Sequence, residues 1–284
     1  MPSSFHGRRP ELGQNNLVDR RVAARMVGLL PPGPVLELGA GDGALTRLLA
    51  VRPWPVTAVE LDPRRAARLR RELPAAVRVE QADMLEVSLR PAGPAHSAGP
   101  ARPVAAAHRA ATRRPDRPDP HDDRTAGHIV SNVPFGITSA LLRRLLGDPG
   151  WATAVLLLQW EVARKRAGVG RTTLLTASWW PWFEFELAGR VPAAAFRPRP
   201  AVDGGLLVLR RRTDPLVDPR ARGDYQRLVR TAFSADRLRP ALRGIRGAAR
   251  WAARERVAAT TRPGELSADQ WASLHAAVTV PDRP

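Results

Sequence analysis

The 284-residue sequence contains no cysteine, which excludes disulfides, thiolate metal sites and a cysteine nucleophile. No run approaches the roughly 18 apolar residues that are needed to cross a membrane. The N-terminal stretch also lacks the apolar centre of a signal peptide. We therefore expect a cytoplasmic protein, and we expect it to bind no metal.

Lysine is almost absent, because Lys165 is the only one and every other basic residue except histidine is arginine. The preference for arginine is typical of a high-GC genome, but it does not account for the net charge of +18. A chain this basic is most simply a ligand of a polyanion, since neutralising phosphates releases counterions and drives association. Hydrophobic residues make up 44% of the chain, which is enough for a sizeable core.

The first 90 residues alternate between helical and extended patterns. Such alternation is typical of βαβ units, and it predicts a Rossmann-like α/β sheet with helices on both faces. We expect helices at 15–30, 43–52 and 63–73, and strands at 34–43, 55–62 and 76–83. The helix at 63–73 has an arginine-rich side that we expect to be exposed.

Residues 91–127 break this pattern, because they are rich in proline, alanine, arginine and histidine and have no hydrophobic period. We predict a disordered or irregular insertion, in which His96, His108 and His121 have no scaffold to form a metal site. Long structureless loops are uncommon inside compact domains, so a changed reading frame in the gene is the alternative.

Regular patterns return after residue 127. We expect strands at 128–136 and 151–160, a helix at 137–146 and a basic helix start at 161–171. A hairpin formed by 177–192 and 201–212 would close the sheet. Residues 1–213 would then form one α/β domain, and residues 214–284 a small helical second domain.

A glycine-rich turn, "ELGAGDG", follows the first buried strand. Gly39, Gly41 and Gly43 permit a tight turn and bring backbone N–H groups close to a ligand. Glu60 ends the next strand, where a carboxylate can bind ribose hydroxyls. These features predict a nucleoside-containing cofactor, and they fit nicotinamide and S-adenosylmethionine sites equally well.

Asp83 lies at the predicted end of the third strand, next along the same edge of the sheet. Its carboxylate can accept a hydrogen bond from the exocyclic amine of a cofactor adenine, with Met84 packed near the base. A helix cap is the alternative role for a lone Asp at a strand end.

The segment "NVPF", residues 132–135, offers chemistry that a nicotinamide site does not need. The amino group of adenine is a poor nucleophile, because its lone pair is conjugated with the ring. The side-chain oxygen of Asn132 and the carbonyl of Val133 can both accept its hydrogens, while Pro134 fixes the turn. Phe135 offers a face on which a flipped-out base can stack. A turn with a core aromatic is the structural alternative.

Two later segments have less specific patterns. Arg164, Lys165, Arg166 and Arg171 form a basic stretch that could bind RNA phosphates. The tryptophans of "SWWPWF", which are Trp179, Trp180 and Trp182, could stack on bases, but in a hairpin they are more typical of a core.

Taken together, these motifs resemble those of the Erm rRNA adenine-N6 methyltransferases, which are relatives of the KsgA-type dimethyladenosine transferases. The matching segments are "GQNNL", with Asn16 at a usual Phe position, "LELGAGDGALT", "VELDP", "QADML", "SNVPFGITS", "QWEVARKRAG", "FRPRPAVDG" and "LVLRRR". The resemblance implies a class I methyltransferase fold and a small helical C-terminal domain. It covers most of residues 11–215 outside the insertion.

The resemblance also implies which residues bind which ligand. The expected contacts to S-adenosylmethionine are Asn15, Leu17, Gly39, Glu60, Asp83 and Asn132, with Gly41, Leu61 and Met84 lining the same pocket. Asn132 and Phe135 would hold the target adenine. The implied function of the chain, as a monomer, is methylation of an adenine in the peptidyl-transferase loop of 23S rRNA. This modification blocks macrolide, lincosamide and streptogramin B antibiotics.

Three alternatives remain at this stage. A KsgA-like enzyme would act on 16S rRNA, although that family usually has N-L-P-Y where this chain has "NVPF". A catalytically weak factor for ribosome assembly would keep the fold and bind rRNA. A nicotinamide-dependent reductase would use the glycine turn, but it would leave "NVPF" without a role.

Overall fold

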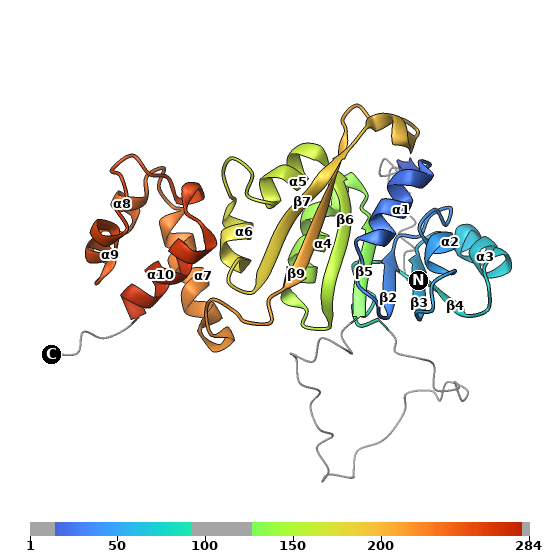
Figure 1. Ribbon diagram of the computed structural model, residues 1–284, viewed down its shortest axis with the longest axis horizontal. Helices are drawn as coiled ribbons and strands as arrows, with labels where there is room; N and C mark the ends of the chain where they lie inside the picture. Colours follow the sequence, from blue (N-terminus) through green and yellow to red (C-terminus); the bar gives the residue numbers. More distant parts are fainter. Residues whose placement is uncertain (1–14, 92–126, 280–284) are drawn as a thin grey trace, which may run out of the picture.

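The computed structural model describes residues 15–91 and 127–279. The predicted insertion at 91–127 falls almost entirely outside the described residues, as do Gly13 and Gln14 of the N-terminal motif. Figure 1 shows a central twisted sheet with helices on both faces and a group of helices at the C-terminal end. The predicted fold class is confirmed.

The main sheet has seven strands in the order β4-β3-β2-β5-β6-β9-β7. Its strands are β2 (Val35–Leu38), β3 (Val56–Glu60), β4 (Val77–Gln81), β5 (Gly127–Asn132), β6 (Trp151–Gln159), β7 (Phe183–Val191) and β9 (Gly204–Arg211). The pairs from β4 to β6 are parallel, whereas β9 pairs antiparallel with both of its neighbours. A separate antiparallel pair joins β1 (Asn16–Leu17) to β8 (Phe196–Arg197).

Helices cover the sheet from both sides, and those that follow residue 221 form a group at its C-terminal end (Figure 1). The helices are α1 (Arg20–Gly28), α2 (Thr46–Leu49), α3 (Pro63–Glu72), α4 (Thr138–Gly147), α5 (Trp160–Arg166), α6 (Leu174–Trp179), α7 (Arg222–Ala232), α8 (Leu238–Ala241), α9 (Ala248–Arg254) and α10 (Ala268–Thr279). Successive strand residues face opposite sides, so Val35 joins the core under α1, α2 and α3, while Leu36 joins the core under α4. The C-terminal helices extend this second core.

Several predicted boundaries were wrong for local reasons. The first helix does not begin at residue 15, because residues 16 and 17 pair as β1 and Asp19 caps the helix through the N–H groups of Arg21 and Val22. The third strand ends at Gln81 rather than at Asp83. The tryptophan-rich start of the predicted hairpin forms helix α6, which Thr173 caps through the N–H of Thr176.

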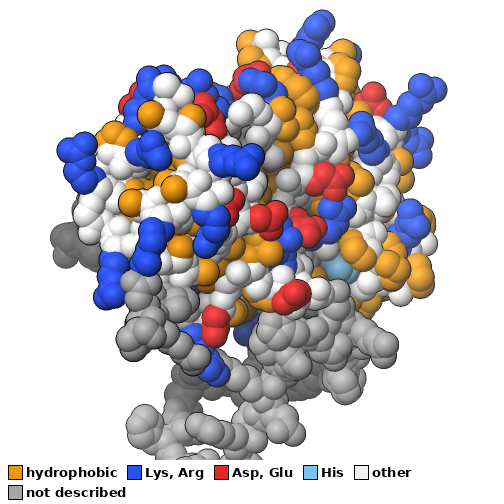
Figure 2. All heavy atoms as spheres, turned by 60° about the vertical axis from the view of Figure 1, so that its left-hand side comes forward, with side chains coloured by type: hydrophobic (Ala, Val, Ile, Leu, Met, Phe, Trp, Pro, Cys, Tyr) orange, Lys and Arg blue, Asp and Glu red, His pale blue; other side chains and the backbone are white. Residues whose placement is uncertain are grey.

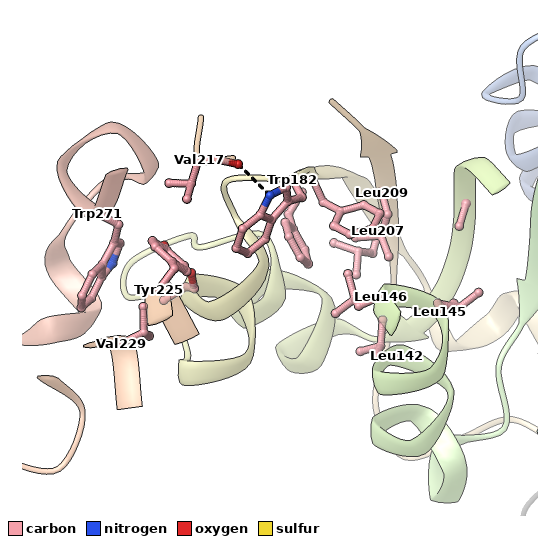
Figure 3. Close-up of a cluster of buried hydrophobic side chains, with 14 of the residues drawn as sticks. Leu142, Leu145, Leu146, Trp182, Leu207, Leu209, Val217, Tyr225, Val229 and Trp271 are labelled. Atoms are coloured by element: carbon pink, nitrogen blue, oxygen red, sulfur yellow. Dashed lines mark hydrogen bonds between the residues drawn. The ribbon is translucent and has the colours of Figure 1, made fainter. Parts of the chain in front are cut away.

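An aromatic cluster joins the C-terminal helices to the sheet. Trp182 is buried, edge-on to Tyr225, and donates a hydrogen bond of 2.8 Å from Nε1 to the carbonyl of Val217. Figure 3 shows Trp182 between the leucines of β9 and the side chains of α7 and α10. Trp179 and Trp180 are half-buried, so the predicted core role holds fully only for Trp182.

Two glycines in the connection between α8 and α9 provide a matched pair for a stability test. Gly244 and Gly247 have the same φ of +82°, where any L side chain is strained by about 1–2 kcal/mol. A Cβ at Gly247 would also clash with the Ala277 carbonyl oxygen of α10, whereas a Cβ at Gly244 meets nothing.

We therefore expect Gly247→Ala to lower the free energy of unfolding by at least about 2 kcal/mol more than Gly244→Ala does. Urea denaturation of both variants, followed by circular dichroism, measures the difference. Equal destabilisation would mean that α10 yields easily at this contact, contrary to the packing described.

Candidate active site

A cavity lies where the strands β4, β3, β2 and β5 end, at the carboxyl edge of the sheet. Ligands bind at this edge in open α/β sheets. The predicted residues that line the cavity are Asn15, Gly39, Gly41, Glu60, Leu61, Asp83, Met84, Asn132, Val133, Pro134 and Phe135. The structure thus brings together residues that are up to 120 positions apart in the chain, from Asn15 to Phe135.

The glycine turn after β2 is held directly against Glu60. The N–H of Gly41 donates to Glu60 Oε2 at 2.7 Å, and the N–H of Asp62 donates to Oε1 at 2.9 Å. Glu60 is 5% exposed, and each carboxylate oxygen keeps a further lone pair for a hydroxyl donor. Gly39 has a φ of +74°, and a Cβ there would lie 2.5 Å from Met84 Cε, so a side chain would crowd the cavity.

The opposite part of the cavity combines apolar surface with one carboxylate. Leu61 is 59% exposed although it is a leucine, which leaves an apolar face open at the cavity wall near Met84. Asp83 accepts the N–H of Leu85 at 2.8 Å, so one of its oxygens shapes the turn that carries Met84. Arg144 of α4 donates to the carbonyls of Met84, at 2.6 Å, and Val87, which fixes this turn.

Asn132 ends β5, and its side-chain amide has a defined orientation. Nδ2 donates to the carbonyl of Asn15 at 2.9 Å, so Oδ1 is the atom that remains as an acceptor toward the cavity. The N–H of Val133 donates to Leu157 of β6, which anchors the turn from below. Pro134 then leads into the short 3₁₀ helix η1 (Phe135–Ile137), with Phe135 half-buried at the cavity wall.

Glu37 is a buried carboxyl group just below the glycine turn, and it is 2% exposed. Burial, with a smaller contribution from the neighbouring carboxylate of Glu60, raises the pKa of Glu37 from its ordinary 4.5 to about 8. Glu37 is therefore protonated at neutral pH in the folded protein. In the unfolded chain it has already lost its proton above about pH 5.

This difference predicts a pH-dependent stability contribution that Glu37→Gln removes. The folded state binds more protons between pH 4.5 and 8, so the Glu37 contribution to stability is full below pH 4.5 and falls as the pH rises to about 8. We expect the free energy of unfolding of Glu37→Gln, relative to the parent, to rise by up to about 1.4 kcal/mol per pH unit across this window. Urea titrations at several pH values measure the slope, and a flat difference would contradict it.

Some predicted residues lie away from the cavity. Leu17 is buried in the core under α1, beside the pair of β1 and β8, and does not line the cavity. Among the basic residues, Lys165 is exposed and Arg164 pairs with Glu161 at 3.3 Å. Arg164, Lys165 and Arg166 lie on α5, and Arg171 lies in the loop after it.

The other two basic residues make contacts within the protein. Arg166 is half-buried, donates to Thr173 Oγ1 at 2.8 Å, and has its pKa lowered by burial and by the nearby charge of Arg143. Arg171 lies 3.7 Å from Glu265. The neighbouring Thr172 donates its N–H to the Gly264 carbonyl at 2.8 Å, so the basic loop is attached to the C-terminal helices.

The cavity also contains residues that the sequence pattern did not reveal. These are Asn16, Val59, Arg65, Ala82, Leu85 and Ile137. Arg65 belongs to the helix whose arginine-rich side we expected to be exposed, but it is half-buried. Its place in the first turn of α3, directly after Glu60 and Asp62, was the missed signal, because helical side chains point back toward the N-terminus.

The donors and acceptors of the cavity fit a zwitterionic adenosyl cofactor. The glycine turn leaves room for a ligand against its backbone, Glu60 offers acceptors for ribose, and Leu61 and Met84 provide apolar surface for a base. Together with the strand order and the antiparallel β9, this site defines a class I methyltransferase. In the described part of the chain no helix is long and apolar enough to span a membrane, and no cluster of His, Asp and Glu side chains is suited to a metal.

Comparison with known proteins narrows the class to one family. The chain matches the family model of ribosomal RNA adenine dimethylases over residues 5–279, and it belongs to this family. It is 49% identical over 278 residues to the mycinamicin-resistance protein MyrB of Micromonospora griseorubida, covering 95% of this chain and 78% of that protein. An rRNA adenine N-6-methyltransferase of Corynebacterium diphtheriae is 42% identical over 238 residues, with 83% and 81% covered.

A solved structure agrees with this assignment. The crystal structure of the 23S rRNA methyltransferase ErmE superposes with a TM-score of 0.74 at 32% identity, covering 92% of this chain and 98% of that one. The chain is thus an S-adenosylmethionine-dependent rRNA adenine-N6 methyltransferase, and its resemblance to the Erm enzymes is confirmed. The nicotinamide-dependent reductase considered from the sequence is wrong.

Proposed function

We propose that this enzyme methylates N6 of an adenine in the peptidyl-transferase loop of 23S rRNA and thereby protects ribosomes from macrolide, lincosamide and streptogramin B antibiotics. The observation that carries the proposal is the orientation of Asn132 at the end of β5, where Nδ2 donates to the Asn15 carbonyl and Oδ1 is left as an acceptor. Proteins similar to this chain include a mycinamicin-resistance protein and a 23S rRNA methyltransferase of solved structure. The site of action would be the cytoplasm, and the enzyme would act as a monomer.

In this proposal the cofactor occupies the part of the cavity between β2 and β4. Glu60 accepts the ribose hydroxyls with the lone pairs that Gly41 and Asp62 leave open. Asp83 accepts a hydrogen bond from the cofactor adenine, and Leu61 and Met84 pack on the base. Asn15, Gly39 and Gly41 line the remaining part of the cofactor pocket, whereas Leu17 supports it from the core.

The target adenine would enter next to Asn132. Bound S-adenosylmethionine supplies a methyl group that its sulfonium already activates. The protein therefore has to orient the amino group, which is a matter of positioning rather than of strong base catalysis. Asn132 Oδ1 and the carbonyl of Val133 accept the two amino hydrogens, which localises the nitrogen lone pair toward the cofactor. Pro134 holds these acceptors in place, and Phe135 stacks on the base.

The RNA would lie across the active-site edge and the C-terminal helices. Arg239 and Arg243 are exposed, and no acidic residue interrupts the chain between Asp236 and Glu255. Figure 2 turns the C-terminal end of the molecule forward and shows Lys and Arg side chains spread over much of this face. We infer that residues 214–284 form an RNA-binding unit, with Lys165 and Arg164 completing the phosphate contacts.

Expression in a macrolide-sensitive bacterium tests the function directly. We expect macrolide resistance and a new N6-methyladenine in the peptidyl-transferase loop of 23S rRNA, both of them lost with Asn132→Ala at equal protein level. A methylated adenine in 16S rRNA alone would assign the KsgA-like function instead. Binding to rRNA without any methylation would assign an assembly factor.

A further inference from the structure

Asn16 lines the cavity beside the glycine turn. Its strand β1 pairs with β8, with Asn16 opposite Arg197 and Leu17 opposite Phe196. Successive residues of a strand point to opposite sides, so Leu17 enters the core while Asn16 faces the cavity. A Cβ on Gly41 would lie 3.7 Å from Asn16 Oδ1, which places the side-chain amide directly next to the turn.

The backbone around Asn16 is fixed, whereas its side-chain amide is unused. The Asn15 carbonyl accepts Asn132 Nδ2 at 2.9 Å, and the N–H of Val18 donates to the Ala195 carbonyl at 2.9 Å. Asn16 is half-buried, and its side chain takes part in none of the hydrogen bonds among the described residues. The amide can therefore turn either its two N–H donors or its carbonyl oxygen toward a ligand.

The glycine turn has already used its own N–H groups at this point. Gly39 and Ala40 both donate to the Val59 carbonyl at 2.9 Å, and Gly41 donates to Glu60 Oε2 at 2.7 Å. Free N–H groups of a turn that leads into a helix are what usually binds an anion. Because these three are occupied, an anionic group that lies over the turn needs a donor from a side chain.

The cofactor brings such an anionic group to this part of the cavity. It carries a sulfonium, an ammonium and one carboxylate, and the last two belong to its amino acid part. Glu60 is placed for the ribose, Asp83 and Met84 for the base, and Asn132 for the reacting methyl group, so the amino acid part falls to the wall formed by the glycine turn and Asn16. Acidic side chains repel a carboxylate, whereas an amide N–H binds it with a charge-assisted hydrogen bond.

We propose that Asn16 donates a hydrogen bond from Nδ2 to the carboxylate of the cofactor and so holds the amino acid part over the glycine turn. The proposal rests on the assignment of this cavity to the cofactor, but not on 23S rRNA as the substrate. Asn16 stands at a usual Phe position of the Erm motif, so the contact is a specificity-determining feature of this chain.

Calorimetric binding of three adenosyl thioethers to the full chain at neutral pH tests this contact. S-adenosylhomocysteine has the carboxylate and the amine, 5′-deoxy-5′-(3-aminopropylthio)adenosine has the amine alone, and 5′-methylthioadenosine has neither. We expect Asn16→Leu to weaken S-adenosylhomocysteine binding by at least about 10-fold, the usual cost of losing a hydrogen bond to a charged group. Binding of the other two ligands should stay within about 2-fold, which also reports an intact fold.

A second variant and a matched control sharpen the test. Asn16→Asp keeps the shape of the side chain but places a carboxylate against the ligand carboxylate. We expect it to weaken S-adenosylhomocysteine binding more than Asn16→Leu does, without weakening the ligand that has the amine alone. Val18 belongs to the same segment, is 50% exposed and does not line the cavity, so Val18→Ala should leave all three affinities unchanged.

Three results would overturn the proposal. Equal weakening of all three ligands by Asn16→Leu would show that Asn16 only shapes the cavity. Equal weakening of the two ligands that contain the amine would assign Asn16 Oδ1 to the ammonium instead. Unchanged binding of S-adenosylhomocysteine would remove Asn16 from the cofactor site. An enzyme that binds S-adenosylhomocysteine with the expected dependence on Asn16, but methylates no 23S rRNA, would refute the proposed function alone.

Discussion

Replacing Asn132 with alanine should lower kcat for rRNA methylation by about 10²–10³-fold, the usual cost of losing one preorganised hydrogen-bonding group at a reacting atom. The Oδ1 acceptor disappears, so the adenine amino group keeps its conjugation with the ring and remains a poor nucleophile. Transfer of a radiolabelled methyl group to an rRNA fragment under single-turnover conditions measures the chemical step.

The hydrogen bond from Asn132 Nδ2 to the Asn15 carbonyl suggests a sharper control. Asn132→Asp keeps an acceptor of the same size but places a carboxylate oxygen against that carbonyl, without the N–H that joined them. We expect this variant to lose activity as well, because the acceptor is no longer oriented. Activity of Asn132→Ala within tenfold of the parent would contradict the proposed role of this side chain.

The order of the sheet was largely predictable because buried parallel strands have a simple signature. Short apolar runs such as those of β2 and β5 are followed by glycine or end in Asn-Val-Pro, and their alternation with helices gives the crossover topology. Helix α6 was missed because its aromatic residues are typical of strands, whereas its helical conformation depends on the Thr173 cap and on burial against the C-terminal helices. The placement of β9 between β6 and β7 is a tertiary property that the local pattern did not contain.

The cavity was most predictable at the carboxyl ends of the strands. Gly39, Glu60 and Asn132 occupy such positions, and the sheet brings them together at one edge. Arg65 and Ile137 belong to helices whose orientation over that edge depends on packing. Leu17 shows the converse, because it belongs to a motif that resembles a cofactor segment but its side chain packs into the core. Proximity in the sequence to a functional motif is thus weaker evidence than position at the end of a strand.

The aromatic cluster at the junction with the C-terminal helices gives the largest stability prediction. Trp182 is 2% exposed and packs edge-on against both Trp179 and Tyr225. We expect Trp182→Ala to lower the free energy of unfolding by about 3–5 kcal/mol, because it removes the buried indole and leaves a cavity. Chemical denaturation followed by far-UV circular dichroism gives this value.

Trp182→Phe separates the ring from its hydrogen bond. Phenylalanine keeps most of the packing but leaves the Val217 carbonyl without the Nε1 donor. We expect this unsatisfied buried acceptor to lower the free energy of unfolding by about 1–3 kcal/mol. The missing part of the indole should lower it by a smaller amount.

Since the same cluster attaches α7 to the sheet, the alanine variant should also raise the KM for rRNA more than it weakens S-adenosylhomocysteine binding. Equal losses in both would show that the C-terminal helices support the cofactor cavity as well, because the core under α4 is continuous from the sheet to Trp271.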